Sequence, residues 1–376
     1  MKKNVMMLVA ALMLSIFCQA SEPTAAAKLS ERATLVKIFE ALNGAAWSER
    51  DKKGWCTDAP LGEWAGVDVD AEGNVVKLKL PLSNVKGTLP AEVENLTSLK
   101  YLEIRFFNMK TGNQNPVPAC VFQMTSLENL RLSVYTSNTD EYIQLPATIN
   151  LPNIKYLILS EVKGDLRQLG TCTNVEQITL KNCTPDIPDE IANCTKLNLL
   201  YWESQGAPTK PLTPELAKLT NLSKLEIYAK TPYGEKLPDF IWNISSLKVL
   251  ALKNVASNHG ELDAKKVAQL PSIENLRLIK NGITNLPEDL FAIATIKYLT
   301  LSDNAISGKI PASIGNSNLY SLDLDGNAEL TGKIPESMGN LKNLYSLSLK
   351  RTAVEQKIPK SVQALPRFES FSQRIF

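Results

Sequence analysis

The 376-residue sequence contains a single histidine, His259. One histidine excludes a metal site built from several imidazoles, and it leaves histidine-based acid–base catalysis dependent on one side chain. The sequence also lacks an excess of either charge: Lys+Arg is 41 and Asp+Glu is 39, and Lys2 and Lys3 near the start account for the difference. A neutral chain gives no net-charge signal for nucleic acid or an anionic membrane, so we predict no nucleic-acid partner.

A hydrophobic stretch long enough to span a membrane is missing as well. The first 20 residues hold Lys2, Lys3 and then a mostly apolar run of 14 residues, Val5 to Cys18, whereas a spanning helix needs about 20. A basic start, a short apolar run and a final Ala20 are the pattern of a signal peptide cleaved after Ala20. Lipid attachment at Cys18 is the alternative, and the bulky Phe17 before it speaks against that. We therefore expect no transmembrane segment and a secreted, periplasmic or cell-surface protein.

Cysteines are too few for a disulfide scaffold. Removal of residues 1–20 leaves an odd number, so at least one thiol is free or intermolecular. Stability must therefore come from packing. The five that remain are Cys56, Cys120, Cys172, Cys183 and Cys194.

What the sequence does contain is an internal repeat. The clearest copy starts at Ile296 and reads IKYLTLSDNAISGKIP, with further copies at Leu319 and Leu344. Twelve units fill residues 75–367 at about 24 residues each, and a partial thirteenth copy starts at Phe368. The predicted starts are Val75, Leu99, Leu127, Ile154, Val175, Leu197, Leu222, Leu247, Ile273, Ile296, Leu319 and Leu344.

The spacing within each unit has a physical meaning. Apolar residues at positions 4 and 6 alternate with polar ones, which is the period of a half-buried strand, and stacked copies share one core. Asn281, Asn304 and Asn327 occupy position 9, where the chain leaves the strand. Their amides can bond the backbone groups that leave the sheet there, so we predict a buried asparagine ladder.

These motifs resemble the plant-type leucine-rich repeat, LxxLxLxxNxLxGxIP, of receptor ectodomains and secreted bacterial proteins. Gly308–Pro311 and Gly332–Pro335 match its Gly-x-Ile-Pro quartet, and Trp47, Trp55 and Glu63–Val67 are similar to its N-terminal cap. The cysteines of that cap are absent: Gly62 and Val69 stand in their places. The resemblance implies an α/β repeat fold, a curved leucine-rich repeat solenoid with a parallel concave β-sheet and a helical N-terminal cap.

The sequence then divides into a signal peptide at 1–20, a linker and N-terminal cap at 21–74, twelve leucine-rich repeats at 75–367 and a C-terminal cap at 368–376. Leu35, Ile38, Phe39 and Leu42 have helical spacing and predict the cap helix, with Ser30 as its N-cap.

Several repeats depart from the pattern. Those starting at Leu99 and Leu127 carry insertions, Lys110–Asn115 and Thr136–Gln144, which are either drift or binding loops. Cys172 and Cys194 share one position of adjacent repeats, where other units place core residues. Stacked strands are close enough for a disulfide, but we favour two buried thiols, because free cysteine packs as a small hydrophobe.

Candidate chemical groups are sparse. Asp68–Gly73 resembles the start of a calcium-binding loop, but Lys79 occupies the position of the bidentate Glu that such a loop requires. We therefore favour a hairpin turn. Asp303, Asp323 and Asp325 fall near one face and are interpreted as a solvated acidic surface, with calcium as the alternative. His259 has no evident nucleophile partner. We predict no metal, no cofactor and no catalytic site, so the protein is not expected to be an enzyme.

The remaining candidate site is the concave sheet, where exposed strand positions are rich in Tyr and Arg, the residues enriched at binding hot spots. The Tyr201 and Tyr228 side chains are expected to lie within contact distance across adjacent strands. We predict a protein partner on this face, with a glycan, a purely structural surface role, or an ordinary polar sheet face as alternatives. The candidate binding residues are Tyr101, Glu103, Arg105, Arg131, Tyr156, Tyr201, Glu203, Glu226, Tyr228 and Arg277.

Overall fold

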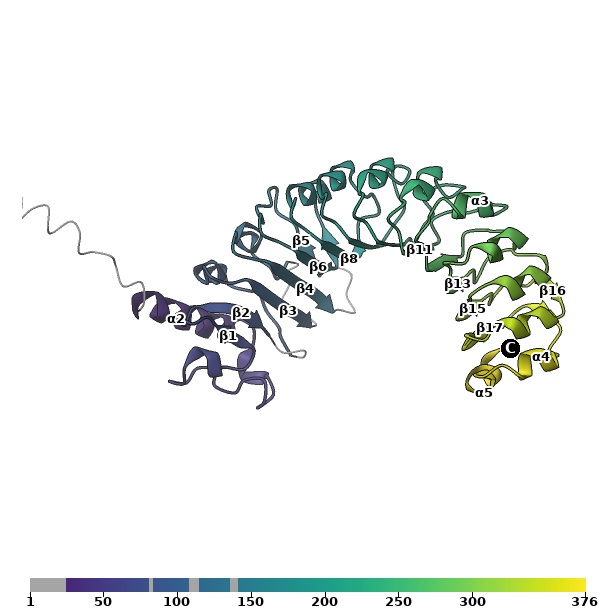
Figure 1. The fold of residues 1–376 in the computed structure, drawn as a ribbon. Helices are drawn as coiled ribbons and strands as arrows, with labels where there is room; N and C mark the ends of the chain where they lie inside the picture. Colours follow the sequence, from purple (N-terminus) through teal and green to yellow (C-terminus); the bar gives the residue numbers. More distant parts are fainter. Residues whose placement is uncertain (1–24, 81–83, 108–114, 136–140) are drawn as a thin grey trace, which may run out of the picture.

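The chain forms an arc of stacked repeats with strands on its inner side and short helices on its outer side (Figure 1). The structure is a computed structural model, and it describes residues 25–80, 84–107, 115–135 and 141–376. Side chains are described from residue 31 onward within those ranges. The proposed signal peptide lies outside the described residues. Within them, no helix combines the length and the apolar character that a membrane span requires.

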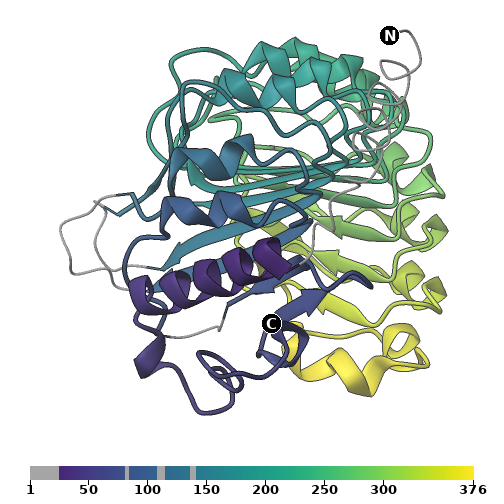
Figure 2. The same cartoon turned by 90° about the vertical axis from the view of Figure 1, so that its left-hand side faces the viewer.

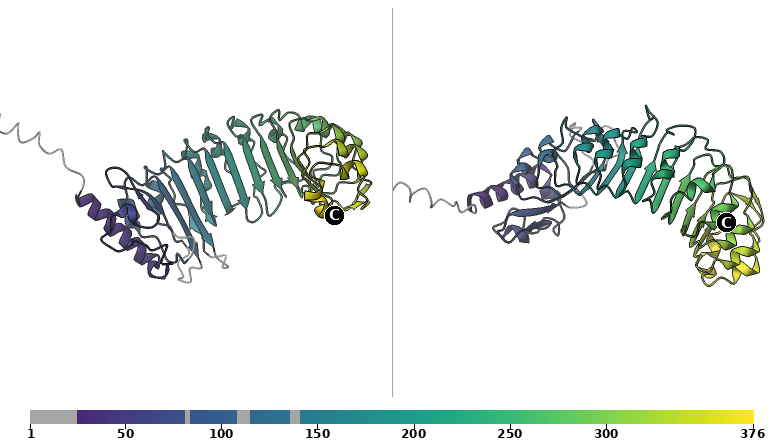
Figure 3. Two further views of the ribbon diagram at one scale, coloured as in Figure 1. Left: turned by 60° about the horizontal axis from the view of Figure 1, so that its bottom comes forward. Right: turned by 45° about the horizontal axis from the view of Figure 1, so that its top comes forward.

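The inner surface is one 13-stranded sheet (Figure 3). Its first strand pairs antiparallel with the second, and all later neighbours pair in parallel. Twelve of the strands follow the twelve predicted repeat starts, one for each. The strands are β1 (Val67–Val69), β2 (Val75–Lys79), β3 (Tyr101–Phe107), β4 (Asn129–Tyr135), β6 (Tyr156–Ser160), β8 (Gln177–Cys183), β9 (Leu199–Ser204), β10 (Lys224–Tyr228), β11 (Val249–Lys253), β12 (Asn275–Ile279), β13 (Tyr298–Thr300), β15 (Ser321–Asp323) and β17 (Ser346–Ser348).

The outer surface carries one short helical turn in most repeats. Many of these turns begin directly after a proline, because proline fixes φ and needs no donor at a helix start. They are η3 (Ala91–Asn95), η4 (Ala119–Gln123), η5 (Leu166–Thr171), η6 (Asp189–Asn193), η7 (Pro214–Lys218), η8 (Asp239–Asn243), α3 (Ala264–Val267), η9 (Glu288–Ala292), η10 (Ala312–Asn316), η11 (Glu336–Asn340) and α4 (Lys360–Gln363).

Two smaller sheets lie between the inner and outer surfaces. A three-stranded parallel sheet joins the last repeats, and a two-stranded one lies near the inserted repeats. Between them, Gly234–Ala256 and Gly260–Ile283 form isolated bridges. The strands are β14 (Gly308–Lys309), β16 (Leu330–Gly332) and β18 (Ala353–Val354), and β5 (Ile143–Gln144) with β7 (Val162–Lys163).

The predicted asparagine ladder is confirmed. The fully buried Asn281 accepts the N–H groups of Val255 and Ala256 at 2.9 and 3.0 Å and donates to the Leu252 carbonyl at 2.8 Å. Asn304 and Asn327 bond the backbone of their own and the preceding repeat in the same way. Each asparagine therefore ties two repeats together, and Asn281 serves a repeat whose own position 9 is valine.

The N-terminal end of the arc is closed by α2 (Ala25–Ala41) and the segment after it, which includes η1 (Gly44–Ala46) and η2 (Leu61–Glu63) (Figure 2). The Trp47, Trp55 and Trp64 rings pack in series with centroids 5.3 Å apart, and each indole N–H donates to a backbone carbonyl. The predicted helical cap is thus confirmed. The start predicted for the helix is wrong, because α2 begins five residues before Ser30.

The C-terminal end is closed by α5 (Phe368–Phe371) and η12 (Ser372–Arg374). Phe371 and Ile375 are buried, and the Ile375 carbonyl accepts the N–H of Leu349 at 2.6 Å. The prediction of a partial thirteenth repeat starting at Phe368 is wrong, because this segment folds as a helix instead of pairing with β17 as a strand.

Two further predictions are confirmed. Asp70 accepts the N–H of Asn74 at 2.7 Å within the β1–β2 turn, so Asp68–Gly73 is a hairpin. Cys172 and Cys194 are free, fully buried thiols. Burial raises the pKa of Cys172 to about 11 and, with the neighbouring Cys172, that of Cys194 to about 12.

Candidate functional site

The parallel register arranges the concave side chains in rows that run across the strands. One row contains Glu103, Arg131, Ile158, Thr179 and Tyr201 on β3, β4, β6, β8 and β9. A second row begins with Arg105, Ser133, Ser160 and Lys181. Neighbours in a row lie about 4.8 Å apart along the sheet, so long side chains from adjacent strands contact one another.

The first cluster in these rows surrounds Glu103. The Tyr101 hydroxyl donates to its carboxylate, Arg105 lies 3.3 Å from it and Lys79 3.6 Å from it. Glu103 is only 4% exposed as a result, which contradicts its prediction as an exposed strand residue. Burial alone would raise the pKa of Glu103, but Tyr101 and the nearby cations outweigh it and lower that pKa. Burial and the Glu103 contact raise the pKa of Tyr101 to about 12.

A second cluster lies on β9 and β10. The Tyr201 and Tyr228 rings stack with centroids 5.2 Å apart, which confirms their predicted contact. Tyr201 donates to Glu203 at 2.9 Å, and Tyr228 donates to Glu226 at 3.2 Å. Burial and these carboxylates raise the pKa of both phenols.

Glu226 is the second predicted site residue that the structure buries. The residue is 6% exposed, and its carboxylate accepts the Tyr228 hydroxyl and forms an ion pair with Lys224 at 2.8 Å. The small Ala251 lies next to it in the row and Arg277 follows, and Arg277 interacts with the Tyr228 hydroxyl. The Arg277 Nε also donates to Asn275 at 3.0 Å. Thus Arg277 and the β9–β10 tyrosines belong to one cluster.

The tyrosine ring faces are occupied by neighbouring side chains. Lys77 on β2 and Arg131 on β4 lie over the Tyr101 ring, at 5.9 and 5.7 Å from its centroid. Lys181 on β8 lies 5.7 Å from the Tyr201 centroid, and Tyr228 stacks from the other adjacent strand. These cation–π and stacking contacts hold the cations and rings in place. Tyr156, two strands from Tyr101 in its row, is partly exposed.

Between the two clusters lies a pocket of about 670 Å³. Its existence follows from the short side chains Ser133 and Ser160, which lie in line on adjacent strands while longer side chains surround them. The sequence-predicted residues that line it are Glu103, Arg105, Arg131 and Glu203. The other lining residues are Ser133, Val134, Tyr135, Ile158, Leu159, Ser160, Glu161, Lys181 and Asn182.

Sequence reasoning missed the aromatic pair at the edge of this pocket. Phe107 and Tyr135 stack with centroids 5.2 Å apart and an interplanar angle of 14°, and Tyr135 is 51% exposed. Both stand at position 9 of adjacent repeats, where asparagine is expected. Aromatic residues at one position of two neighbouring units were the signal that could have revealed the pair. The insertions that follow lie mostly outside the described residues.

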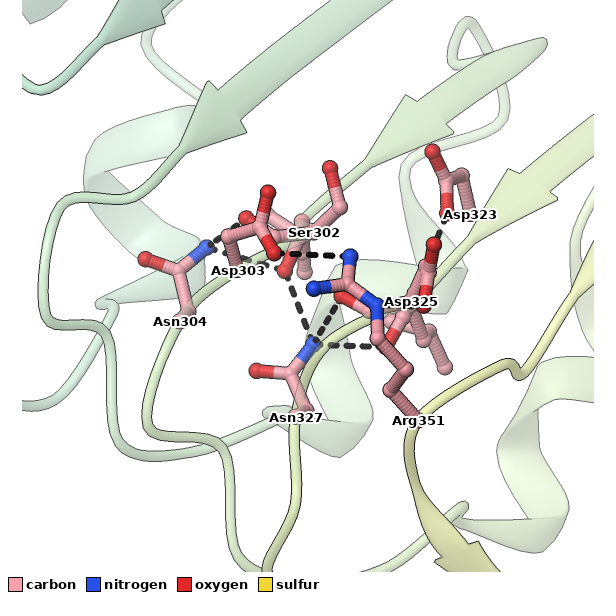
Figure 4. A network of polar contacts seen from close by, with 9 residues as sticks. Ser302, Asp303, Asn304, Asp323, Asp325, Asn327 and Arg351 are labelled. Atoms are coloured by element: carbon pink, nitrogen blue, oxygen red, sulfur yellow. Dashed lines mark hydrogen bonds and ion pairs between the residues drawn. The ribbon is translucent and has the colours of Figure 1, made fainter.

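Two of the three aspartates near the end of the sheet are bridged by one arginine (Figure 4). Arg351 contacts Asp303 at 2.9 Å and Asp325 at 3.1 Å, while Asp323 accepts the Asp325 N–H at 3.0 Å. In the described residues no group of three or more His, Cys, Asp or Glu side chains is arranged to hold a metal ion.

His259 accepts the Leu237 N–H at 3.2 Å, and burial and nearby lysines lower its pKa.

Comparisons with known proteins agree with this architecture. The sequence model described as Leucine Rich Repeat matches residues 295–317. Receptor-like protein 7 of Arabidopsis thaliana is 29% identical over 170 residues, which are 44% of this chain and 16% of that protein. The adenylate cyclase of Schizosaccharomyces pombe is 24% identical over 266 residues, 62% of this chain and 15% of that protein. The chain thus spans about one sixth of the length of these relatives.

Superposition on solved structures of other proteins identifies the fold. A plant peptide hormone receptor, RGFR1 in complex with RGF2, superposes with a TM-score of 0.60 at 22% identity and covers 81% of this chain and 51% of that chain. A leucine-rich repeat protein of Leptospira interrogans has a TM-score of 0.50 at 22% identity, with 77% and 82% covered. The protein therefore has a leucine-rich repeat solenoid fold.

Proposed function

We propose that this is a non-catalytic recognition protein, acting outside the cytoplasm, that binds a protein partner on its concave face. The pocket between the two tyrosine clusters carries the proposal: a hollow of about 670 Å³ in the concave surface, with charged side chains and an exposed aromatic ring around it. Arg and Tyr side chains around a hollow are typical of binding hot spots. The plant peptide hormone receptor RGFR1 has the same fold and was solved in complex with RGF2, which supports this choice.

Glycan binding at the same tyrosines is the alternative. Stacking on a sugar ring requires an uncovered aromatic face, but Tyr201 lies between Lys181 and Tyr228, and Tyr101 between Lys77 and Arg131. We therefore favour a protein partner, for which the tyrosines act as positioning residues for Glu203 and the cations.

The experiment is a binding screen of purified 21–376 against extracellular proteins and glycans. Tyr201→Ala/Tyr228→Ala removes the second cluster, and Ser133→Trp fills the pocket from a half-exposed position. Ser348→Trp, at a half-exposed concave position on β17 far from the pocket, is the matched control. A protein hit lost in the first two variants and kept in the control is expected. A glycan hit would favour the alternative, and no hit together with oligomers in light scattering would favour a structural role.

A further inference from the structure

The charged groups around the pocket differ in how completely they are paired. Glu103 is buried and already contacts Tyr101, Arg105 and Lys79. Arg131, in contrast, has no carboxylate within 4 Å among the described residues. Its Nε donates to Asn129 at 2.9 Å and its guanidinium lies over the Tyr101 ring, so these two contacts hold the side chain in place where it lines the pocket.

Glu203 is the counterpart at the opposite end. One carboxylate oxygen accepts the Tyr201 hydroxyl at 2.9 Å, and no cation of the described residues lies within 4 Å of either oxygen. Lys181 lies between the two ends and is engaged over the Tyr201 ring. The pocket therefore presents two cations without an ion-pair partner among the described residues, Arg131 on β4 and Lys181 on β8, and one such carboxylate, Glu203 on β9.

The separation of these ends suits an extended chain. From β4 to β9 there are three strand spacings, through β6 and β8, which is about 14 Å. Glu203 lies two residues beyond Tyr201, the residue in the row of Arg131, so the two positions are about 16 Å apart on the diagonal. An extended peptide rises about 3.3 Å per residue, so four to five residues cover this distance. Between the ends, Ser133, Ile158 and Ser160 leave room for a backbone, and the exposed Tyr135 ring, four residues after Arg131 on β4, offers an apolar surface at the pocket wall.

We propose that the pocket binds an extended peptide segment that carries an acidic and a basic side chain four to five residues apart, the acidic one at Arg131 and the basic one at Glu203. This rests on the proposed function, because it names the part of a protein partner that the concave face recognises. Charge complementarity orients the segment, since Arg131 attracts its acidic side chain and Glu203 its basic one.

The test uses a display library of random ten-residue peptides, selected on the purified protein produced from its full-length sequence. Enriched peptides are sequenced, synthesised with blocked termini and titrated against wild type, Arg131→Ala and Glu203→Gln. Lys253→Ala removes an exposed concave lysine on β11, outside the pocket, and serves as the control. We expect enrichment of acid–base pairs four to five residues apart, and about a tenfold or greater weakening by each pocket variant but not by Lys253→Ala.

The outcomes distinguish a failure of the peptide proposal from a failure of the proposed concave-face function. Enriched peptides without the charge pattern, or binding that Arg131→Ala and Glu203→Gln leave unchanged, would overturn the charge assignment. If an extracellular protein binds and Ser133→Trp blocks it while no peptide is enriched, the concave-face function stands and the peptide proposal fails. A glycan hit in the binding screen, with no protein hit there and no enriched peptide here, would overturn both.

Discussion

Removal of the Asn281 side chain should destabilise the array more than its size suggests. Asn281 is fully buried, and its carboxamide oxygen accepts two backbone N–H groups of the preceding repeat, from Val255 and Ala256. Its amide nitrogen donates to the carbonyls of Leu252 and Ile279 at 2.8 and 3.0 Å. In Asn281→Ala both N–H groups lose this acceptor inside the core.

The expected cost follows from those two donors. An orphaned buried polar group costs about 1–3 kcal/mol, so two of them give about 2–6 kcal/mol, and we expect about 3 kcal/mol because water can enter part of the space. Val255 itself shows why position 9 tolerates an apolar residue: its backbone is served by the asparagine of the next repeat. Removing a position-9 side chain is therefore expected to cost much free energy of unfolding only where that side chain is a ladder asparagine.

The assay is urea unfolding followed by tryptophan fluorescence and far-ultraviolet circular dichroism, analysed for the change in midpoint and slope. Asn275→Ala is the control, since the half-exposed side chain of Asn275 accepts a hydrogen bond only from Arg277 among the described contacts. A change within about 0.5 kcal/mol is expected. A loss of less than about 1 kcal/mol in Asn281→Ala, or one equal to the control, would refute the ladder as a source of stability.

Two further predictions concern the C-terminal repeats. Burial, with the Asp325 and Asp303 carboxylates, raises the pKa of Asp323, so the wild-type protein loses stability as the pH rises from about 4 through that pKa. In paired denaturant titrations, Asp323→Asn should therefore be more stable than wild type at pH 7 but not at pH 3. An equal effect at the two pH values would contradict this. Gly339→Ala would place a Cβ atom 2.7 Å from the Ser361 backbone and should lower stability by about 1–3 kcal/mol. The control is Gly234→Ala, whose Cβ atom meets nothing within 4 Å and should leave stability unchanged. Thermal melting of both variants measures the difference.

The parts of the fold that repeat were predictable from the sequence. Each strand start, the asparagine ladder and the Tyr201–Tyr228 contact follow from positions within a unit, because the period decides which face a residue occupies and the register decides its neighbours. The cap helix was predictable from its apolar spacing. Its start was not, because α2 continues through residues 25–30 without a boundary signal.

The site itself was predictable only in part. Periodicity places Glu103 and Glu226 on the concave face, but it does not say that long neighbouring side chains cover them. The pocket escaped prediction for a related reason. It arises from two short serines, Ser133 and Ser160, that become neighbours only once β4 and β6 are in register. Hollows of this kind depend on differences between repeats, whereas repeat analysis detects what repeats share.

The asparagine ladder and the three-stranded side sheet both lie in the last repeats, toward the C-terminus. Stability in a stacked array is approximately a sum of repeat and interface terms, and folding can nucleate in any repeat and spread to its neighbours. We expect it to nucleate in these last repeats, where the ladder and the side sheet add hydrogen bonds. Synthesis runs from the other end, with N-terminal parts of a chain generally folding first. We expect the nascent chain to remain open until its final repeats emerge, after which order spreads backwards toward the tryptophan-rich cap.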